Sequence, residues 1–306
     1  MNIGLIGLGR MGANMARRLA RAGTRVIAFD RSADARAALG DERGTTTVST
    51  AAALLSALGT PRVVWLMLPA GDVTQAVLDE LAPQLQRGDI IIDGGNAYYK
   101  DTVRRAAALG GRGLTMIDAG VSGGVWGLQN GYGLMVGGPA EAVATITPIL
   151  QQLAPAADRG WVHCGASGAG HFAKMVHNGI EYGMMQALAE GLALMQAKRD
   201  FDFDLAAVTE AWRDGTVIRS WLLDLTAEFL RADADLAEIA PHVPDSGEGR
   251  WTALEAVELG VPAPVMSLAL MARFASRGHS DYANKLLAMM RKSFGGHAIK
   301  QERSAI

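Results

Sequence analysis

The stretch Ile3-Gly4-Leu5-Ile6-Gly7-Leu8-Gly9-Arg10-Met11-Gly12 decides the fold of this chain. Its first four residues predict a buried strand, and an amphipathic helix is predicted over Met11–Ala22. Gly7 permits a tight turn, Gly9 lets the backbone approach a pyrophosphate, and Gly12 lets the helix pack on the strand. We therefore predict that residues 7 to 12 bind a dinucleotide: Gly7, Leu8, Gly9, Arg10, Met11 and Gly12. The alternative is a glycine turn without a ligand.

Asp30 follows the predicted strand Arg25–Phe29, at the position expected of the acid that binds the adenosine ribose. A carboxylate there accepts both ribose hydroxyls, which favours NAD. Arg31 comes next, however, and its guanidinium can pair with the 2′-phosphate of NADP, so both cofactors remain open. Leu68, Pro69 and Ala70 end a further parallel strand and are expected at the same edge of the sheet.

The secondary-structure pattern changes near residue 163. Before it, short β-branched runs alternate with helical stretches, and strands are predicted at Ile3–Ile6, Arg25–Phe29, Val63–Leu68, Ile90–Asp93, Thr115–Asp118 and Gly133–Val136. After it, the helical segments include Gly168–Met195, Asp204–Gly215, Ile218–Arg231, Ala253–Glu258 and Ala263–Ser276. We predict an α/β Rossmann-type, doubly wound parallel sheet over residues 1–163, followed by an all-α domain over residues 164–306.

Composition narrows the class of protein. The 306 residues are 49% hydrophobic and carry a formal net charge of −2, so nothing global attracts nucleic acid or an anionic membrane. Cys164 is the only cysteine, which excludes an intrachain disulfide and fits a reducing cytoplasm; we expect it to be buried. The chain starts directly on its first strand, and the apolar run Val261–Ala272 is too short to span a bilayer. We expect a cytoplasmic protein.

Two glycine-rich segments follow strands and are candidates for substrate binding. Asp93-Gly94-Gly95-Asn96 places backbone amides and the Asn96 amide at the cofactor edge of the sheet. Asp118-Ala119-Gly120-Val121-Ser122-Gly123-Gly124 offers a hydroxyl between flexible glycines, a plausible cradle for a carboxylate. Either segment alone can be a structural turn. Two glycine-rich segments at the same edge of the sheet together favour a site for a small-molecule substrate.

The segment from Gly168 to Tyr182 carries the chemistry. At about 100° per residue, Lys174, His177, Asn178 and Glu181 fall within one stripe of a helix. The alternative is a solvated charged face, but the segment is otherwise apolar and rich in methionine. A partly desolvated lysine loses its proton more readily and can then accept the proton of a hydroxyl group.

The chain resembles the decarboxylating 6-phosphogluconate dehydrogenases of the β-hydroxyacid dehydrogenase superfamily, nearly from end to end. The stretches that carry the resemblance are Gly7 to Gly12, Asp93 to Asn96, Ser122 to Gly124, Lys174-Met-Val-His-Asn-Gly-Ile-Glu-Tyr182, Ile218 to Leu222, Asp245 to Thr252 and Ala272-Arg273. The resemblance implies oxidation of 6-phosphogluconate to ribulose 5-phosphate and carbon dioxide, with NAD or NADP and no metal. It also implies a homo-oligomer of the short bacterial form.

Site roles follow from the resemblance. It implies that Lys174 is the general base and Glu181 the general acid, with Asn178 and His177 orienting the substrate. The other implied contacts are of three kinds: Asn96, Ser122, Gly123 and Gly124 at the acid end of the substrate, Asn96 also at the cofactor, and Tyr182, Arg250 and Arg273 at the phosphate. His297, in the tail opened by Gly295-Gly296, is implied to reach a partner subunit's site, although a frayed terminus is the alternative.

The sequence departs from the family pattern in two places. Arg250 replaces the lysine of the long family members, and Asp30-Arg31-Ser32 replaces the Asn-Arg-Thr of NADP-dependent members. The nearest rival is a dehydrogenase of the 3-hydroxyisobutyrate type, which does not decarboxylate and gives no reason for Glu181, Tyr182 and Arg273. A rival of another class is a catalytically silent NAD-binding protein.

Overall fold

The computed structural model describes residues 2–40, 42–295 and 298–300. Its internal contacts divide the chain into two units, Met1–His177 and Asn178–Ile306. The division falls within one long helix, whereas the predicted boundary at residue 163 marks the change from mixed to helical secondary structure. Among the described residues, no helix is long and apolar enough to cross a membrane.

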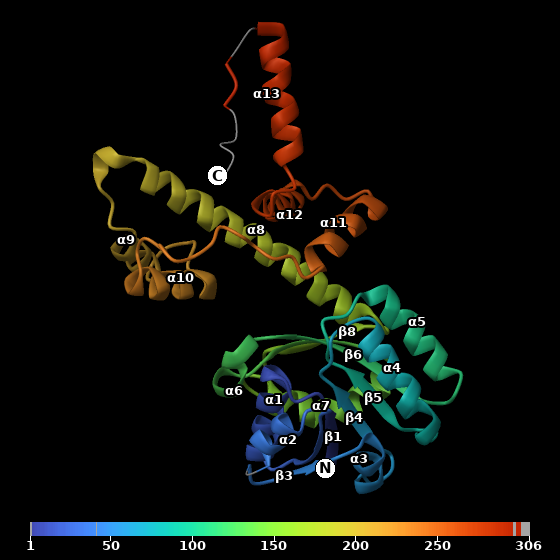
Figure 1. The fold of residues 1–306 in the computed structure, drawn as a ribbon. Helices are drawn as coiled ribbons and strands as arrows, with labels where there is room; N and C mark the ends of the chain where they lie inside the picture. Colours follow the sequence, from blue (N-terminus) through green and yellow to red (C-terminus); the bar gives the residue numbers. More distant parts are fainter. Residues whose placement is uncertain (1, 41, 296–297, 301–306) are drawn as a thin grey trace. The chain divides into compact units, whose positions relative to one another are not determined.

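An eight-stranded sheet forms the centre of the first unit (Figure 1). Its strands, in the spatial order β3-β2-β1-β4-β5-β6-β7-β8, are β1 (Asn2–Ile6), β2 (Arg25–Phe29), β3 (Thr45–Val48), β4 (Val63–Leu66), β5 (Ile90–Asp93), β6 (Thr115–Ser122), β7 (Gly133–Gly137) and β8 (Trp161–Gly165). All neighbours pair in parallel except β6 and β7. The strand order reverses between β1 and β4, the place where such sheets bind their ligands.

Helices cover both faces of this sheet and create two cores. They are α1 (Arg10–Arg21), α2 (Ala33–Leu39), α3 (Ala51–Ala57), α4 (Asp72–Leu81), α5 (Tyr99–Gly110), α6 (Gly127–Asn130) and α7 (Ala140–Leu153), with short 3₁₀ turns at Ala82–Gln84 and Gly124–Trp126. Along β1, Ile3 and Leu5 pack with α1 and α7, while Ile6 packs with α3 and α4. This alternation of side chains explains how one strand serves both cores.

Helices joined by loops make up the second unit, and its described residues include no strand. The helix α8 (Ala169–Ala197) begins in the first unit and ends in the second. The others are α9 (Leu205–Trp212), α10 (Trp221–Ala232), α11 (Glu248–Leu259), α12 (Pro264–Ser276) and α13 (Asp281–Gly295), with a 3₁₀ turn at Arg199–Phe201. Asp204 and Ser220 cap α9 and α10 through hydrogen bonds to backbone amides, which explains where these helices begin. The predicted fold class is confirmed.

Four details differ from the prediction. The edge strands β3 and β8 were not predicted, because neither has the buried apolar run that marks a central strand. The return from β6 to β7 is antiparallel, since the connection is too short for a full helical crossover. The helix α13 was not predicted either. The prediction of a buried Cys164 is wrong, because the edge strand β8 leaves this side chain exposed.

Candidate active site

The glycine loop between β1 and α1 has the geometry that a bound pyrophosphate requires. Gly7 has a φ of +97°, and a Cβ there would overlap the carbonyl oxygen of Met67. A Cβ at Gly12 would overlap the carbonyl oxygen of Gly7, so the helix and strand touch at this point. Gly9, by contrast, faces open space, and no side chain caps α1. The first amides of α1 can therefore hold a phosphate that approaches over Gly9.

Asp30 is hydrogen-bonded to this loop. Its Oδ2 accepts from the Leu8 amide at 2.6 Å, and its Oδ1 accepts from the Ser32 amide at 2.8 Å. Each carboxylate oxygen has a second lone pair, so both can still accept a ribose hydroxyl. Arg36, which the sequence analysis missed, donates to the carbonyl oxygens of Asp30 and Arg31 and fixes this turn.

A pocket of about 380 Å³ lies beside Asp30, within the size range of small-molecule sites. Five of the predicted cofactor residues line it: Gly7, Asp30, Arg31, Leu68 and Pro69. Thr50 and Val73, which were not predicted, also line it. The pocket does not include Ala70 or Asn96, which are exposed after β4 and β5 respectively. The structure thus brings the adenosine side of the predicted cofactor site together.

The start of α8 is anchored on β6 by Asp118. This buried carboxylate accepts hydrogen bonds from the amides of Gly168 at 2.7 Å and His171 at 2.8 Å. A negative charge at a helix N-terminus is favourable, because the first amides of the helix have no partners within it. The predicted strand Thr115–Asp118 is in fact longer: Ser122 is its last residue, and Gly123 and Gly124 begin the following turn.

Glycines allow α8 to approach the sheet closely. A Cβ at Gly120 would overlap the Cβ of Lys174, and a Cβ at Gly170 would overlap the carbonyl oxygen of Met135. On β7, a Cβ at Gly137 would lie 2.7 Å from the amide nitrogen of Gly170. Gly120 lies on β6, two residues before Ser122. The backbone of this strand therefore determines where the Lys174 side chain lies.

Lys174 is only 8% exposed, and its Nζ lies 3.5 Å from Nδ1 of His177. The side chains of His177, Asn178 and Glu181 are partly buried. Because α8 continues without a break through these residues, Asn178 is one turn from Lys174 and Glu181 is two turns away, on the same helix face. This confirms that one helix carries the amine, imidazole, amide and carboxylate.

In the second unit, Tyr182 and Arg273 form a stacked pair. The guanidinium carbon of Arg273 lies 3.6 Å from the centre of the Tyr182 ring, and its Nη1 donates to the Pro244 carbonyl oxygen at 2.9 Å. Ser246 donates to Glu248 at 2.6 Å, so the Tyr182 hydroxyl, 3.3 Å away, donates to Ser246. These contacts hold the guanidinium and the phenol side by side.

Arg250 takes a different arrangement. It pairs with Asp245, and its guanidinium carbon lies 4.7 Å from the centre of the Phe274 ring. Burial acts to raise the pKa of Asp245, but the hydrogen bonds from Arg250 and from the Gly247 amide outweigh it and bring this pKa below its ordinary value. A substrate anion bound by Arg250, as predicted, would therefore have to compete with the Asp245 carboxylate. His297 lies outside the described residues.

The fold and these side chains define a dinucleotide-dependent dehydrogenase. Family models for the NAD binding domain and the C-terminal domain of 6-phosphogluconate dehydrogenase match residues 2–165 and 170–304. The chain belongs to the 6-phosphogluconate dehydrogenase family.

Relatives agree with this assignment. The NAD(+)-dependent, decarboxylating 6-phosphogluconate dehydrogenase of Haloferax volcanii is 43% identical to this chain, and the aligned region covers 99% of each protein. The structure of Plasmodium falciparum 6-phosphogluconate dehydrogenase is similar, with a TM-score of 0.83 and 30% identity over all of this chain and 67% of that one. The 3-hydroxyisobutyrate dehydrogenase of Mycobacterium tuberculosis shares the fold, with a TM-score of 0.69 and 23% identity over 92% of this chain and 94% of that one.

No group of three or more His, Cys, Asp or Glu side chains is placed to hold a metal ion in the part of the chain that the structure describes. Asp118 and His171, which fix the start of α8, were not predicted as site residues.

Proposed function

We propose that this protein oxidises and decarboxylates 6-phosphogluconate to ribulose 5-phosphate and carbon dioxide while reducing NAD or NADP. The observation that carries the proposal is the single face of α8 with a nearly buried amine and a carboxylate two turns further along. The family assignment supports it, and so does the name of the Haloferax volcanii relative, which covers 99% of both chains.

When bound, the nicotinamide supplies an acceptor for the hydride that leaves C3 of the substrate. Lys174 accepts the proton of the C3 hydroxyl as this oxidation takes place. The protonated Lys174 then donates a hydrogen bond to the new C3 ketone oxygen, which helps the electrons of the carboxylate bond move towards the ketone as carbon dioxide leaves. Loss of carbon dioxide from C1 of the substrate leaves an enediolate, and Glu181 donates a proton to the former C2, which becomes C1 of ribulose 5-phosphate.

The remaining roles concern binding. Asn96, Ser122, Gly123 and Gly124 are proposed to hold the carboxylate end of the substrate, while His177 and Asn178 orient its hydroxyls. For the phosphate we propose Tyr182, Arg250 and Arg273, and for His297 a contact with the substrate in a partner subunit's site. The stacked Tyr182–Arg273 pair supports this assignment, because it presents a hydroxyl and a guanidinium together. For Arg250 the phosphate must compete with Asp245.

Substrate choice separates this function from its nearest rival. Purified protein is expected to reduce NAD with 6-phosphogluconate and to release one carbon dioxide for each cofactor reduced. The absorbance of the reduced nicotinamide and the trapped carbon dioxide measure the two products. Turnover of 3-hydroxyisobutyrate without carbon dioxide would assign the chain to the rival dehydrogenase. Activity on neither acid, with NAD still bound, would favour a silent NAD-binding protein.

Cofactor preference tests the role of Asp30. We propose that NAD is preferred, because the Asp30 carboxylate would repel a 2′-phosphate. Asp30→Asn is expected to raise the Kd of NAD and to lower that of NADP, since it removes the charge but keeps an oxygen for the Leu8 amide. Isothermal titration of both nucleotides measures this change, with Asp34→Asn as a control on the neighbouring helix α2. An unchanged NAD-to-NADP affinity ratio would remove Asp30 from the ribose site.

We also propose that the chain is a cytoplasmic homo-oligomer. The second unit exposes many large apolar side chains, and monomers rarely expose so many together. Those on α11, α12 and α13 that are more than half accessible are Leu254, Val257, Leu259, Val265, Leu268, Tyr282, Leu287 and Met290. Light scattering of the purified protein would measure its mass in solution.

A further inference from the structure

His171 is a buried imidazole in the first turn of α8 that the proposed chemistry does not use. It is 1% exposed, and both of its ring nitrogens have partners in other elements. Nδ1 lies 2.7 Å from the hydroxyl oxygen of Thr102 on α5. Nε2 lies 3.1 Å from the backbone carbonyl oxygen of Asp93, the last residue of β5. The ring therefore joins three elements at one point.

These partners determine which ring nitrogen carries the proton. A backbone carbonyl can only accept, so Nε2 must donate to Asp93. In the neutral imidazole, Nδ1 then accepts from the Thr102 hydroxyl. The backbone of the same residue is also held, because the His171 amide donates to the Asp118 carboxylate. Each contact of the ring is thus directional and specific to one tautomer.

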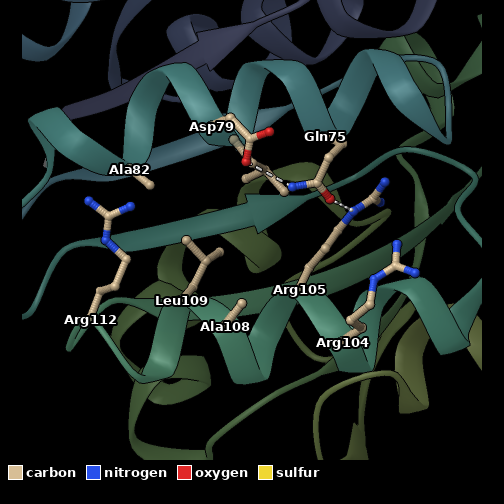
Figure 2. A pocket seen from close by; sticks show the side chains of 9 residues that line it. Gln75, Asp79, Ala82, Arg104, Arg105, Ala108, Leu109 and Arg112 are labelled. Carbon is tan, nitrogen blue, oxygen red and sulfur yellow. Dashed lines mark hydrogen bonds between the residues drawn. The ribbon is translucent and has the colours of Figure 1, made fainter.

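Asp93 is held from its other side as well. Its Oδ1 accepts from the Gly95 amide at 3.0 Å, and its Oδ2 lies 3.8 Å from Nη1 of the buried Arg105. Figure 2 shows Arg105 reaching from α5 to Gln75 on α4, where its Nε donates at 3.0 Å. A further bond joins its Nη2 to the carbonyl oxygen of Gly71 at 2.8 Å. Asp93 thus has little freedom to move.

The hydrogen bond between His171 and Asp93 joins two residues that each lie three positions before a proposed active-site residue. Lys174 follows His171 by one turn of α8, and Asn96 follows Asp93 through two glycines. We propose that His171 is a positioning residue that fixes the Lys174 amine relative to the Asn96 loop. This inference rests on the proposed function. His171 does not contact the substrate in the proposed reaction, because its ring is enclosed by protein.

Matched variants test the two hydrogen bonds. His171→Leu removes both and is expected to lower kcat by about 100-fold, the scale of a displacement of about 1 Å at a reacting group. His171→Gln keeps an N–H for the Asp93 carbonyl and an oxygen for the Thr102 hydroxyl, so it should stay within about tenfold of the wild type. Thr102→Val removes one donor and should lower kcat, whereas Thr102→Ser should not.

Two further readouts distinguish positioning from general stability. The Kd of NADH should change much less than kcat in all four variants, because Asn96 is only one of the proposed cofactor contacts and the glycine loop and Asp30 are not altered. Ile149→Val, which removes a buried methyl group from α7, should lower the melting temperature without lowering kcat. A His171→Leu enzyme with wild-type kcat would overturn the proposal. So would a His171→Gln enzyme as slow as His171→Leu.

The nitrogen-15 spectrum of the histidine rings supplies a test that does not depend on activity. The His171 signal is expected to show its proton on Nε2, the nitrogen that faces the Asp93 carbonyl oxygen. A proton on Nδ1 would overturn the inference even in an active enzyme. If the wild type oxidises only 3-hydroxyisobutyrate, the proposed function fails, and the same variants are compared with that acid, since Lys174 is the base in either reaction.

Discussion

Replacing Lys174 with methionine is expected to reduce kcat with 6-phosphogluconate by a factor of about 10³ or more. Methionine keeps most of the length and volume of the side chain above Gly120 but cannot accept a proton. The Kd of NADH, measured by its fluorescence, should stay near the wild-type value because the glycine loop is untouched. Initial rates over a range of substrate concentrations separate kcat from KM.

Two controls sharpen this experiment. Lys174→Arg keeps a positive charge but remains protonated, so it should be nearly as inactive as the methionine variant if proton transfer is the role. Lys198→Met removes an exposed lysine just beyond α8 and should leave the rate unchanged. A Lys174→Met enzyme with near-normal turnover would refute the assignment of the base.

The second large effect is expected at Gly120, where a single methyl group has no room. Gly120→Ala would place its Cβ only 2.3 Å from the Cβ of Lys174, so either α8 or β6 must move. A displacement of this kind is expected to lower kcat by about 100-fold with little change in the Kd of NADH. Stopped-flow measurement of a single turnover would show whether the oxidation step itself is slowed.

Gly191→Ala provides the matched control for this substitution. Gly191 is a residue of α8 itself, but a Cβ at this position would meet no atom within 4 Å. Alanine should therefore stabilise the helix by about 0.5–1 kcal/mol and leave the rate alone. If Gly120→Ala retained the wild-type kcat, the close packing of Lys174 on β6 would have no bearing on catalysis.

The sequence predicted best the features that depend on residues near one another in the chain. The glycine loop, Asp30 and the polar stripe of α8 each follow from local spacing, and the structure brings Asp30, Arg31, Leu68 and Pro69 to one pocket. The edge strands β3 and β8 were missed because they lack buried apolar runs. The burial of a residue at an edge, such as Cys164, cannot be read from its type alone.

Contacts between distant residues were beyond sequence reasoning. Asp118 bonds to amides at positions 168 and 171, and nothing in the pattern of either segment specifies that pairing. The glycine at position 120 could be noticed, but not that it faces Lys174. The Tyr182–Arg273 pair was expected only through resemblance to the family; its stacked geometry comes from the structure.

The hydrogen bond between Asp30 and the Leu8 amide has a consequence for protein engineering. Exchanging the acid for a small or basic residue, the usual route to a different coenzyme, would also take away the acceptor that steadies the glycine turn. Coenzyme choice and overall nucleotide affinity are therefore not independent traits in this protein. A redesign would have to vary position 30 together with the turn at positions 7 to 9, rather than one residue at a time.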